Sequence, residues 1–271
     1  MPRFFEDRNR RAWDDRVETG QSHTEPVTRR ELANALATLD DCGWLGGSIQ
    51  GQRVLCLAAG GGKHSILCAA AGAVVTVVDL SPRMLELDRR LAQEHGYQVR
   101  TVEASMQSLP MLGAASFDLV LQPVSTCYVP EVLPVYREVA RVLRAGGLYI
   151  SQHKQPACLQ ASVRPVEQGG YVLSEPYYRQ GPLPEVFPGC FHREAGTTEF
   201  LHRWDELIGG LCRSGFVLED LREPGHGDPA AEPATFRHRS AFVPPFVTLK
   251  ARRLEEGGGA SAGGGARIWI P

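Results

Sequence analysis

A glycine loop and a single aspartate form the part of the sequence best suited to hold a ligand. Glycines 60–62 follow the apolar run 54–57 after two alanines, and Asp79 comes directly after the next apolar run, 73–78. A glycine has no Cβ, so the backbone here can approach a ligand closely and can adopt a positive φ. A carboxylate at the end of the neighbouring strand can accept hydrogen bonds from a ribose. The pattern predicts an adenine-nucleoside site.

Three classes of cofactor site share this layout, and the spacing of the glycines separates them. A P-loop needs a glycine five residues before its Gly-Lys pair and a Ser or Thr after it, but Leu57 and His64 hold those places. A dinucleotide-binding loop needs a third glycine at the start of the helix, where this chain has Ser65. An NAD(P)-dependent oxidoreductase therefore remains an alternative with an incomplete motif.

The loop resembles the first motif of the class I S-adenosylmethionine (SAM) methyltransferases, in which hydrophobic residues and an acid precede Gly-x-Gly-x-Gly. Gly60 and Gly62 match, Ala58 replaces the first glycine, and Cys56 stands where the acid is usual. Four further stretches match the family in the same order: Asp79-Leu80, Ser105-Met106 before Leu109-Pro110, Phe117–Val120 leading to Gln122, and Leu143–Leu148. The glycine loop together with the segment 122–132 resembles a bacterial, small-molecule-type subgroup of these methyltransferases.

This resemblance covers residues 50–152 and implies both a fold and a set of cofactor-binding residues. The implied fold is an α/β, doubly wound, Rossmann-like sheet of seven strands, mostly parallel, with an antiparallel last strand. SAM is expected over the carboxyl ends of the first two strands, where open α/β sheets bind ligands in general. Asp79 would bind the ribose hydroxyls, and Ser105 replaces the aspartate that usually contacts the adenine amine. The full implied set is Ala58, Ala59, Gly60, Gly62, Asp79, Leu80, Ser105, Met106 and Gln122.

Alternating strand and helix patterns position these residues. Ser81-Pro82 predicts an N-cap and a first helical position, and the helix should end at Gly96. Further strands are predicted at 98–102, 117–121 and 148–151, and an amphipathic helix at 132–143, capped by Gly146-Gly147, precedes the last of these. Units of strand and helix this short predict a parallel, doubly wound sheet.

The remaining segments suggest three regions. Residues 1–47 contain a predicted amphipathic helix and a second predicted helix, which follows a capping box from Thr28 to Glu31 and ends at Gly43. These helices are expected either to form a lid over the glycine loop or to cover the edge of the sheet. Residues 48–252 form the expected methyltransferase domain, and residues 153–200, rich in proline, glycine and aromatic residues, are expected to be an ordered cap insertion. Residues 253–271 are a glycine-rich tail. A helix over 204–211, strands at 216–221 and 246–251, and a loop at 223–241 complete the domain.

Candidates for substrate binding and catalysis follow the later strands. His153 comes directly after the fifth predicted strand and is a candidate general base, with a surface imidazole as the alternative. Tyr128, Tyr177 and Tyr178 are candidates for the substrate pocket. SAM carries its own electrophile, so the protein mainly has to align the nucleophile and exclude water, and a base is not obligatory. The histidines and cysteines show no metal-ligand spacing, so no metal is expected.

The net charge and the composition limit the classes of partner that are expected. A net charge of −2 and the absence of a basic cluster argue against nucleic acid, and the longest apolar run, 66–78, is too short to span a membrane. Seven scattered cysteines without a CxxC pair, and the lack of a signal peptide, predict a cytoplasmic protein with reduced thiols. We expect a small-molecule methyl acceptor, and the oligomeric state stays open. A catalytically idle SAM-binding protein remains the second alternative.

Overall fold

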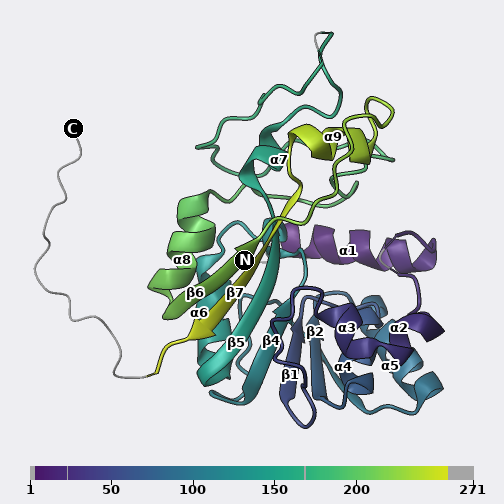
Figure 1. The fold of residues 1–271 in the computed structure, drawn as a ribbon, viewed down its shortest axis with the longest axis vertical. Coiled ribbons are helices and arrows are strands. Elements are labelled where there is room, and N and C mark those ends of the chain that lie inside the picture. Colours follow the sequence, from purple (N-terminus) through teal and green to yellow (C-terminus); the bar gives the residue numbers. More distant parts are fainter. Residues whose placement is uncertain (1–3, 23, 168, 256–271) are drawn as a thin grey trace, which may run out of the picture.

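A seven-stranded sheet runs through the centre of the computed structural model, which describes residues 4–22, 24–167 and 169–255 (Figure 1). The strands lie in the order β3-β2-β1-β4-β5-β7-β6. Neighbours among β1 to β5 are parallel, whereas β7 pairs antiparallel with both β5 and β6. The predicted fold class is thereby confirmed. The strands are β1 (Arg53–Leu57), β2 (Val74–Asp79), β3 (Val99–Glu103), β4 (Phe117–Gln122), β5 (Leu143–Lys154), β6 (Phe216–Arg222) and β7 (Phe246–Arg253).

Helices cover both faces of the sheet because side chains of each central strand alternate between the two faces. In β1, Leu55 and Leu57 pack in a cluster with α6 (Leu133–Val142) and α8 (Gly210–Arg213). Val54 and Cys56 pack on the other face, in a cluster that includes residues of α4 (Lys63–Ala70) and α5 (Pro82–His95). Both faces of the central strands pack against apolar residues, so the sequence of each of these strands is a short continuous apolar run.

The described part of the N-terminal region contains three helices: α1 (Phe4–Glu18), α2 (Arg29–Ala33) and α3 (Ala35–Leu39). The capping box between Thr28 and Glu31 is present as predicted. The single helix expected after it is broken at Asn34, whose side-chain amide donates to the carbonyl of Arg30 at 3.1 Å. Asparagine competes with the helix in this way because its side chain can bond to nearby backbone.

The second half of the chain differs more from expectation. β5 begins at Leu143, directly after α6, so Gly146-Gly147 lies within the strand and does not cap a helix. The helix expected over 204–211 is a π-helical turn, η2 (Asp205–Gly209), followed by α8. The loop expected at 223–241 contains the start of α9 (Phe236–Phe242), which Thr235 caps.

The cap insertion lies above the carboxyl edge of the sheet (Figure 1). It begins with α7 (Pro156–Gln160), and its described residues form no further regular helix before η2. In Figure 1, helix α1 lies across the space between the sheet and the two helices α7 and α9. A short 3₁₀ helix, η1 (Thr126–Tyr128), follows β4 and contacts α1 through the rings of Tyr128 and Trp13. Most of the glycine-rich tail predicted at 253–271 lies outside the described residues.

Candidate active site

The glycine loop turns the chain from β1 into α4 at the carboxyl edge of the sheet. Ala58 and Gly62 adopt positive φ angles of 48° and 88°. Ala58 thus keeps the backbone conformation typical of the glycine that it replaces, at some steric cost. A Cβ added at Gly60 would lie 2.7 Å from Met84 Cβ and 3.0 Å from Asp79 Cγ. The loop therefore needs glycine at position 60 because it packs directly against its own domain.

Asp79 ends β2 and holds the glycine loop from the side. Its Oδ2 accepts the backbone N–H of Gly60 and its Oδ1 accepts that of Ser81, both at 2.9 Å. Ser81 Oγ in turn accepts the N–H of Met84 at 3.0 Å and caps α5. Burial raises the pKa of the Asp79 carboxyl. Asp79 therefore joins the loop to α5, and each of its oxygens has a further lone pair for a ligand.

Asp88 on α5 also supports the glycine loop, although it lies outside every motif recognised in the sequence. The residue is fully buried; its Oδ2 accepts the N–H of Gly61 at 3.0 Å, and its Oδ1 accepts a hydrogen bond from Ser65 Oγ. Burial raises the pKa of Asp88 to about 7. The helical spacing of the sequence could have indicated that Asp88 is buried, because position 88 lies on the same face of α5 as the buried Met84 and Leu91.

Helix α1 reaches the ends of two neighbouring strands. Asp14 Oδ1 accepts a hydrogen bond from Ser81 Oγ at 2.6 Å, just after β2. Glu6 Oε1 accepts one from Ser105 Oγ at 2.7 Å, just after β3. Met106, next to Ser105, is buried. Helix α1 is thus hydrogen-bonded to Ser81 and Ser105, which are the neighbours in sequence of the predicted cofactor residues Leu80 and Met106.

Gln122 ends β4, but its amide already has partners. Its Nε2 donates to Ser125 Oγ at 2.9 Å and contacts Met106 Sδ at 3.2 Å. Its Oε1 accepts a hydrogen bond from the Tyr149 hydroxyl. The residue is only 2% exposed. These contacts favour a role in ordering the loop after β4 over a direct contact with a cofactor.

His153 lies in β5 and is fully buried, which does not favour the general base suggested from sequence. Its Nδ1 bonds with Thr126 Oγ1 and its Nε2 with Ser151 Oγ, both at 2.8 Å. Burial lowers the pKa of His153 to about 3. A general base needs access to the substrate and a pKa near the working pH. The geometry instead favours a structural role in which His153 ties β5 to η1.

Tyr128 ends η1 and faces both α1 and the cap insertion. Its ring packs edge-on against Trp13, with centroids 5.9 Å apart. Its hydroxyl donates to Glu194 Oε2 at 2.8 Å. Burial raises the pKa of Tyr128, so its phenol stays protonated and a donor. Tyr128 therefore lies where the sheet edge, α1 and the cap insertion meet.

Tyr177 and Tyr178 lie elsewhere in the cap insertion. Their rings pack edge-on against each other at 5.4 Å. The Tyr177 hydroxyl accepts the N–H of Trp204 at 3.2 Å, so it is part of the connection to η2. Tyr178 is 72% exposed and lies beneath the guanidinium of Arg203, 5.3 Å from the ring centroid. This exposure does not favour Tyr178 as part of an enclosed substrate pocket.

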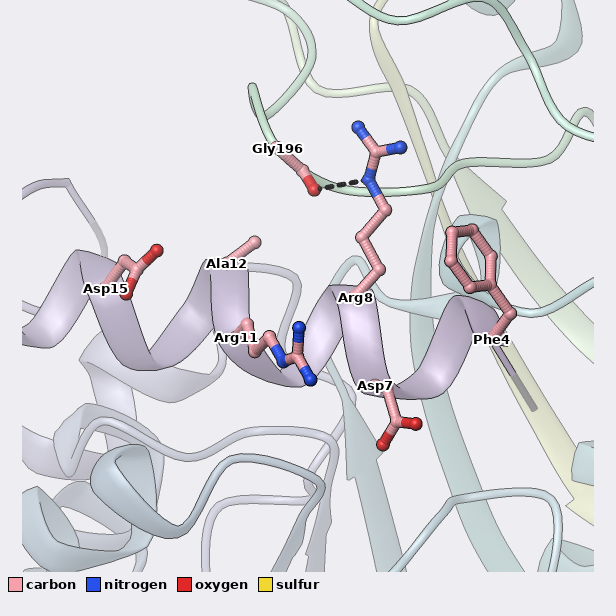
Figure 2. Close-up of a pocket in the computed structure, with 7 residues that line it drawn as sticks. All are labelled: Phe4, Asp7, Arg8, Arg11, Ala12, Asp15 and Gly196. Atoms are coloured by element: carbon pink, nitrogen blue, oxygen red, sulfur yellow. Dashed lines mark hydrogen bonds between the residues drawn. The ribbon is translucent and has the colours of Figure 1, made fainter. Parts of the chain in front are cut away.

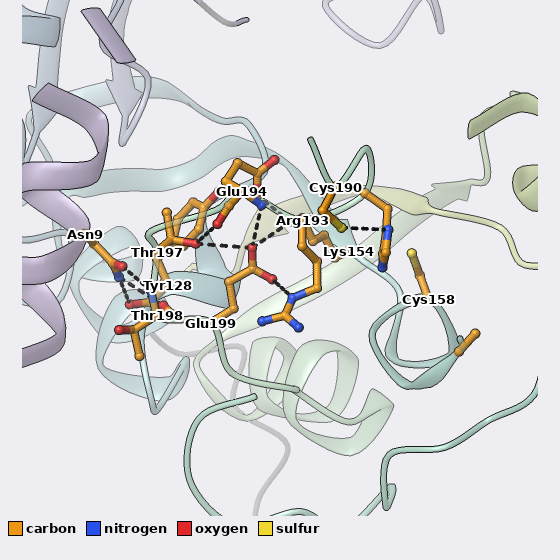
Figure 3. A network of polar contacts seen from close by, with 12 residues as sticks. Asn9, Tyr128, Lys154, Cys158, Cys190, Arg193, Glu194, Thr197, Thr198 and Glu199 are labelled. Atoms are coloured by element: carbon orange, nitrogen blue, oxygen red, sulfur yellow. Dashed lines mark hydrogen bonds and ion pairs between the residues drawn. The ribbon is translucent and has the colours of Figure 1, made fainter. Parts of the chain in front are cut away.

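Four charged residues form a buried ion cluster next to Tyr128 (Figure 3). Lys154 Nζ lies 2.6 Å from Glu194 Oε2 and 3.0 Å from Glu199 Oε1, and Arg193 Nε lies 2.8 Å from Glu199 Oε2. Burial opposes the charge of Lys154, but the two glutamates outweigh it and raise its pKa above the usual value. Two cations and two anions thus balance, and the cluster fixes the cap insertion to the end of β5.

Comparisons with known proteins assign the family. A family described as "Methyltransferase domain" matches residues 55–151. The uncharacterized methyltransferase YbaJ of Bacillus subtilis (strain 168) is 33% identical over 231 residues, which cover 81% of this chain and 90% of the relative. The chain belongs to the class I SAM-dependent methyltransferases. SAM is therefore its cofactor, and the oxidoreductase alternative is set aside.

This methyltransferase is also similar to one solved structure and to one further relative in sequence. Its fold resembles a SAM-dependent methyltransferase from Mesorhizobium loti, with a TM-score of 0.61 and 23% identity over 82% of this chain and 100% of the other. A ubiquinone biosynthesis O-methyltransferase of Bordetella avium (strain 197N) is 32% identical over 137 residues, or 51% of this chain and 53% of the relative. The glycine loop and the carboxylate at the end of β2 are chemically suited to SAM.

A surface hollow of about 420 Å³ lies on the face of α1 that carries Arg8, Arg11 and Asp15, and not on the face that carries Glu6 and Asn9 (Figure 2). Arg8 reaches over it to the carbonyl of Gly196, at 2.9 Å from Nε. Its lining does not include the glycine loop or Asp79: it consists of Phe4, Asp7, Arg8, Arg11, Ala12, Asp15 and Gly196. The hollow is therefore separate from the candidate cofactor site of the methyltransferase.

The described residues contain neither a metal-binding cluster nor a membrane-spanning helix. Within residues 4–22, 24–167 and 169–255, no group of three or more His, Cys, Asp or Glu side chains could hold a metal ion. The same part of the chain contains no helix with the length and apolar character needed to cross a membrane.

Asp88 should give the methyltransferase a stability that falls as the pH rises from about 4 to 7. The folded protein holds the Asp88 proton to a pKa of about 7, whereas an unfolded aspartate releases it near 4. The contribution is therefore complete below about pH 4 and lost by about pH 7, with a size on the order of a few kcal/mol. Asp88→Asn cannot ionise and should remove this dependence, as measured by urea unfolding between pH 4 and 8.

Asp118→Asn is the matched control, because its pKa shift has the opposite sign. Arg53 lowers the pKa of Asp118, so its contribution is present above about pH 4 and lost as the pH falls further. The difference between wild type and Asp118→Asn should therefore shrink only at acid pH. A flat difference between wild type and Asp88→Asn over the whole range would show that Asp88 ionises normally.

Proposed function

We propose that the enzyme transfers the methyl group of SAM to a small organic molecule held between α1, η1 and the cap insertion. The observation that carries this proposal is the position of Asn9 on α1, which is 3% exposed. Its Nδ2 donates to the carbonyls of Tyr128 and Thr198, both at 3.1 Å, and its Oδ1 accepts the N–H of Thr198 at 2.6 Å. One side chain thus joins three elements above the sheet edge, and such an enclosed edge fits a small acceptor better than a polymer.

The cofactor roles follow from the contacts at the ends of β1, β2 and β3. In this proposal the backbone of residues 58–62 holds the amino-acid end of SAM, and Asp79 accepts hydrogen bonds from the ribose. Leu80 and Met106 flank the adenine. SAM supplies the electrophilic methyl group and its own leaving group. The protein has to orient the acceptor in line with that methyl group and keep water out.

The acceptor would lie against Tyr128, whose surroundings combine apolar and polar character. Trp13 provides an aromatic surface beside it, and Lys154 Nζ lies 6.0 Å from the Tyr128 ring centroid. The hydrogen bond from Tyr128 to Glu194 fixes the phenol, so that its orientation does not have to be gained on binding. We therefore assign Tyr128 to acceptor positioning and assign no general base.

Two further observations support a small acceptor. The net charge of −2 gives no electrostatic attraction for nucleic acid. The relative from Bordetella avium is by name an O-methyltransferase of ubiquinone biosynthesis, which acts in the chemistry of a small molecule. A small organic acceptor is the class consistent with both.

Methyl-labelled SAM tests the proposal directly. We expect label to enter the low-molecular-mass fraction of a cell extract when the enzyme is added, and not when Asp79→Ala replaces it. The same extract should be separated into small molecules, nucleic acid and protein before counting. Enzyme-dependent label confined to nucleic acid or protein would refute a small-molecule acceptor.

A further inference from the structure

The end of β3 lies next to the proposed ribose contact. In the sheet Asp79 pairs with Glu103, so Ser105 follows β3 one strand away from Asp79. Neighbouring strands are about 4.8 Å apart. A base attached to a ribose that binds Asp79 can therefore extend toward Ser105, over the buried side chain of Met106.

Helix α1 brings a carboxylate to this end of the site. Glu6, which is half-buried, accepts the hydrogen bond from Ser105 Oγ at 2.7 Å. Eight residues later on the same helix, Asp14 accepts the hydrogen bond from Ser81 Oγ beside Asp79. At 1.5 Å per residue the two carboxylates lie about 12 Å apart along α1. The helix thus extends from the ribose end of the site to its base end.

The chemistry of adenine matches the acceptor that α1 supplies. The exocyclic amine of adenine is a hydrogen-bond donor, and a carboxylate is an acceptor only. A purine with an oxo group at the same ring position would instead present lone pairs to the carboxylate. We propose that Glu6 accepts a hydrogen bond from the adenine amine, so that α1 supplies the residue that selects an adenosyl cofactor. This inference rests on the proposed placement of the ribose at Asp79.

The preference between two ligands tests the role of Glu6. S-adenosylhomocysteine carries the amine, and S-inosylhomocysteine carries an oxo group in its place. We expect the wild-type protein to prefer the adenosyl ligand, and Glu6→Gln to reduce that preference by about tenfold or more in calorimetric titrations. Glu6→Ala should also reduce it, because the acceptor is removed and no donor is added.

Asp7→Asn on an exposed position of the same helix is the matched control and should leave the preference unchanged. Equal weakening of both ligands by Glu6→Gln would mean that Glu6 only holds α1 in place, and an unchanged preference would equally overturn its role in selecting adenine. Asp79→Ala separates these outcomes from a failure of the proposed cofactor placement. It should weaken both ligands alike, and if it weakens neither, the placement itself is wrong. Melting temperatures without ligand show whether each variant is folded.

Discussion

Asp79→Ala should weaken S-adenosylhomocysteine binding by about 100-fold or more and should also lower the melting temperature of the free protein. Two hydrogen bonds from the ribose to a carboxylate contribute about 1.5–3 kcal/mol each, which gives the loss of affinity. The backbone N–H groups of Gly60 and Ser81 would lose their acceptors in the same variant. Each such loss costs about 1–3 kcal/mol, so the melting temperature should fall by several degrees. Calorimetry and thermal unfolding measure the two effects.

Asp79→Asn should fall between wild type and Asp79→Ala, because its amide has one acceptor oxygen and its NH₂ group faces a backbone donor. Asp118→Asn is the control for a structural carboxylate outside the cofactor site. Asp118 Oδ2 accepts the N–H of Arg53 at 2.8 Å, and Arg144 Nε lies 2.7 Å from its Oδ1. Asp118→Asn should therefore lower the melting temperature and leave the affinity for S-adenosylhomocysteine unchanged. Equal affinities for Asp79→Ala and Asp118→Asn would remove Asp79 from the ribose contact.

The central elements could be predicted because their local sequence and their tertiary environment agree. β1, β2 and β4 are buried on both faces, so each appears as a short apolar run. α5 carries its own boundaries, with Ser81 as N-cap, Pro82 in the first turn and Gly96 in a left-handed C-cap. No distant contact was needed to recognise these elements.

Elements that depend on distant partners were predicted less well. β5 extends to Lys154 because β7 pairs with it as far as Phe246, about a hundred residues away in the sequence. α9 was missed because its buried Arg239 looks like a surface residue in the sequence. In the structure the Arg239 guanidinium donates to the carbonyls of Cys158 and Ala161, at 2.8 and 3.0 Å.

The residues of the candidate site also fall into those that local sequence predicts and those that depend on distant contacts. The glycine loop and Asp79 lie within a motif, so their positions could be expected from sequence. Asp88 could also have been found, because it interrupts an apolar helix face. The contact between Glu6 and Ser105 spans 99 positions, and no local pattern predicts it. His153 was expected directly after a short strand at 148–151, whereas in the structure it is a buried residue of the longer β5.

Lys154→Met should lower the free energy of unfolding by about 3–5 kcal/mol, which is the usual effect of breaking a buried ion pair by removing one partner. The Lys154 side chain is 2% exposed, and its removal leaves Glu194 and Glu199 with Arg193 as the remaining cation of the ion cluster. Methyl transfer should fall more than SAM affinity, because the ion cluster fixes the cap insertion beside Tyr128 and not the glycine loop. Urea unfolding, calorimetry and transfer from labelled SAM measure the three quantities.

A double variant shows whether the charges of the ion cluster act together. Glu199→Gln removes one anion, so in combination with Lys154→Met it restores the balance of charge. We expect the double variant to lose clearly less stability than the sum of the two single variants, as coupled charges do. Arg213→Met breaks an exposed ion pair with Asp205 and should change stability by about 1 kcal/mol or less. If Lys154→Met costs no more than Arg213→Met, the ion cluster contributes little to holding the cap insertion on the sheet, and the acceptor site must be closed by the Asn9 contacts instead.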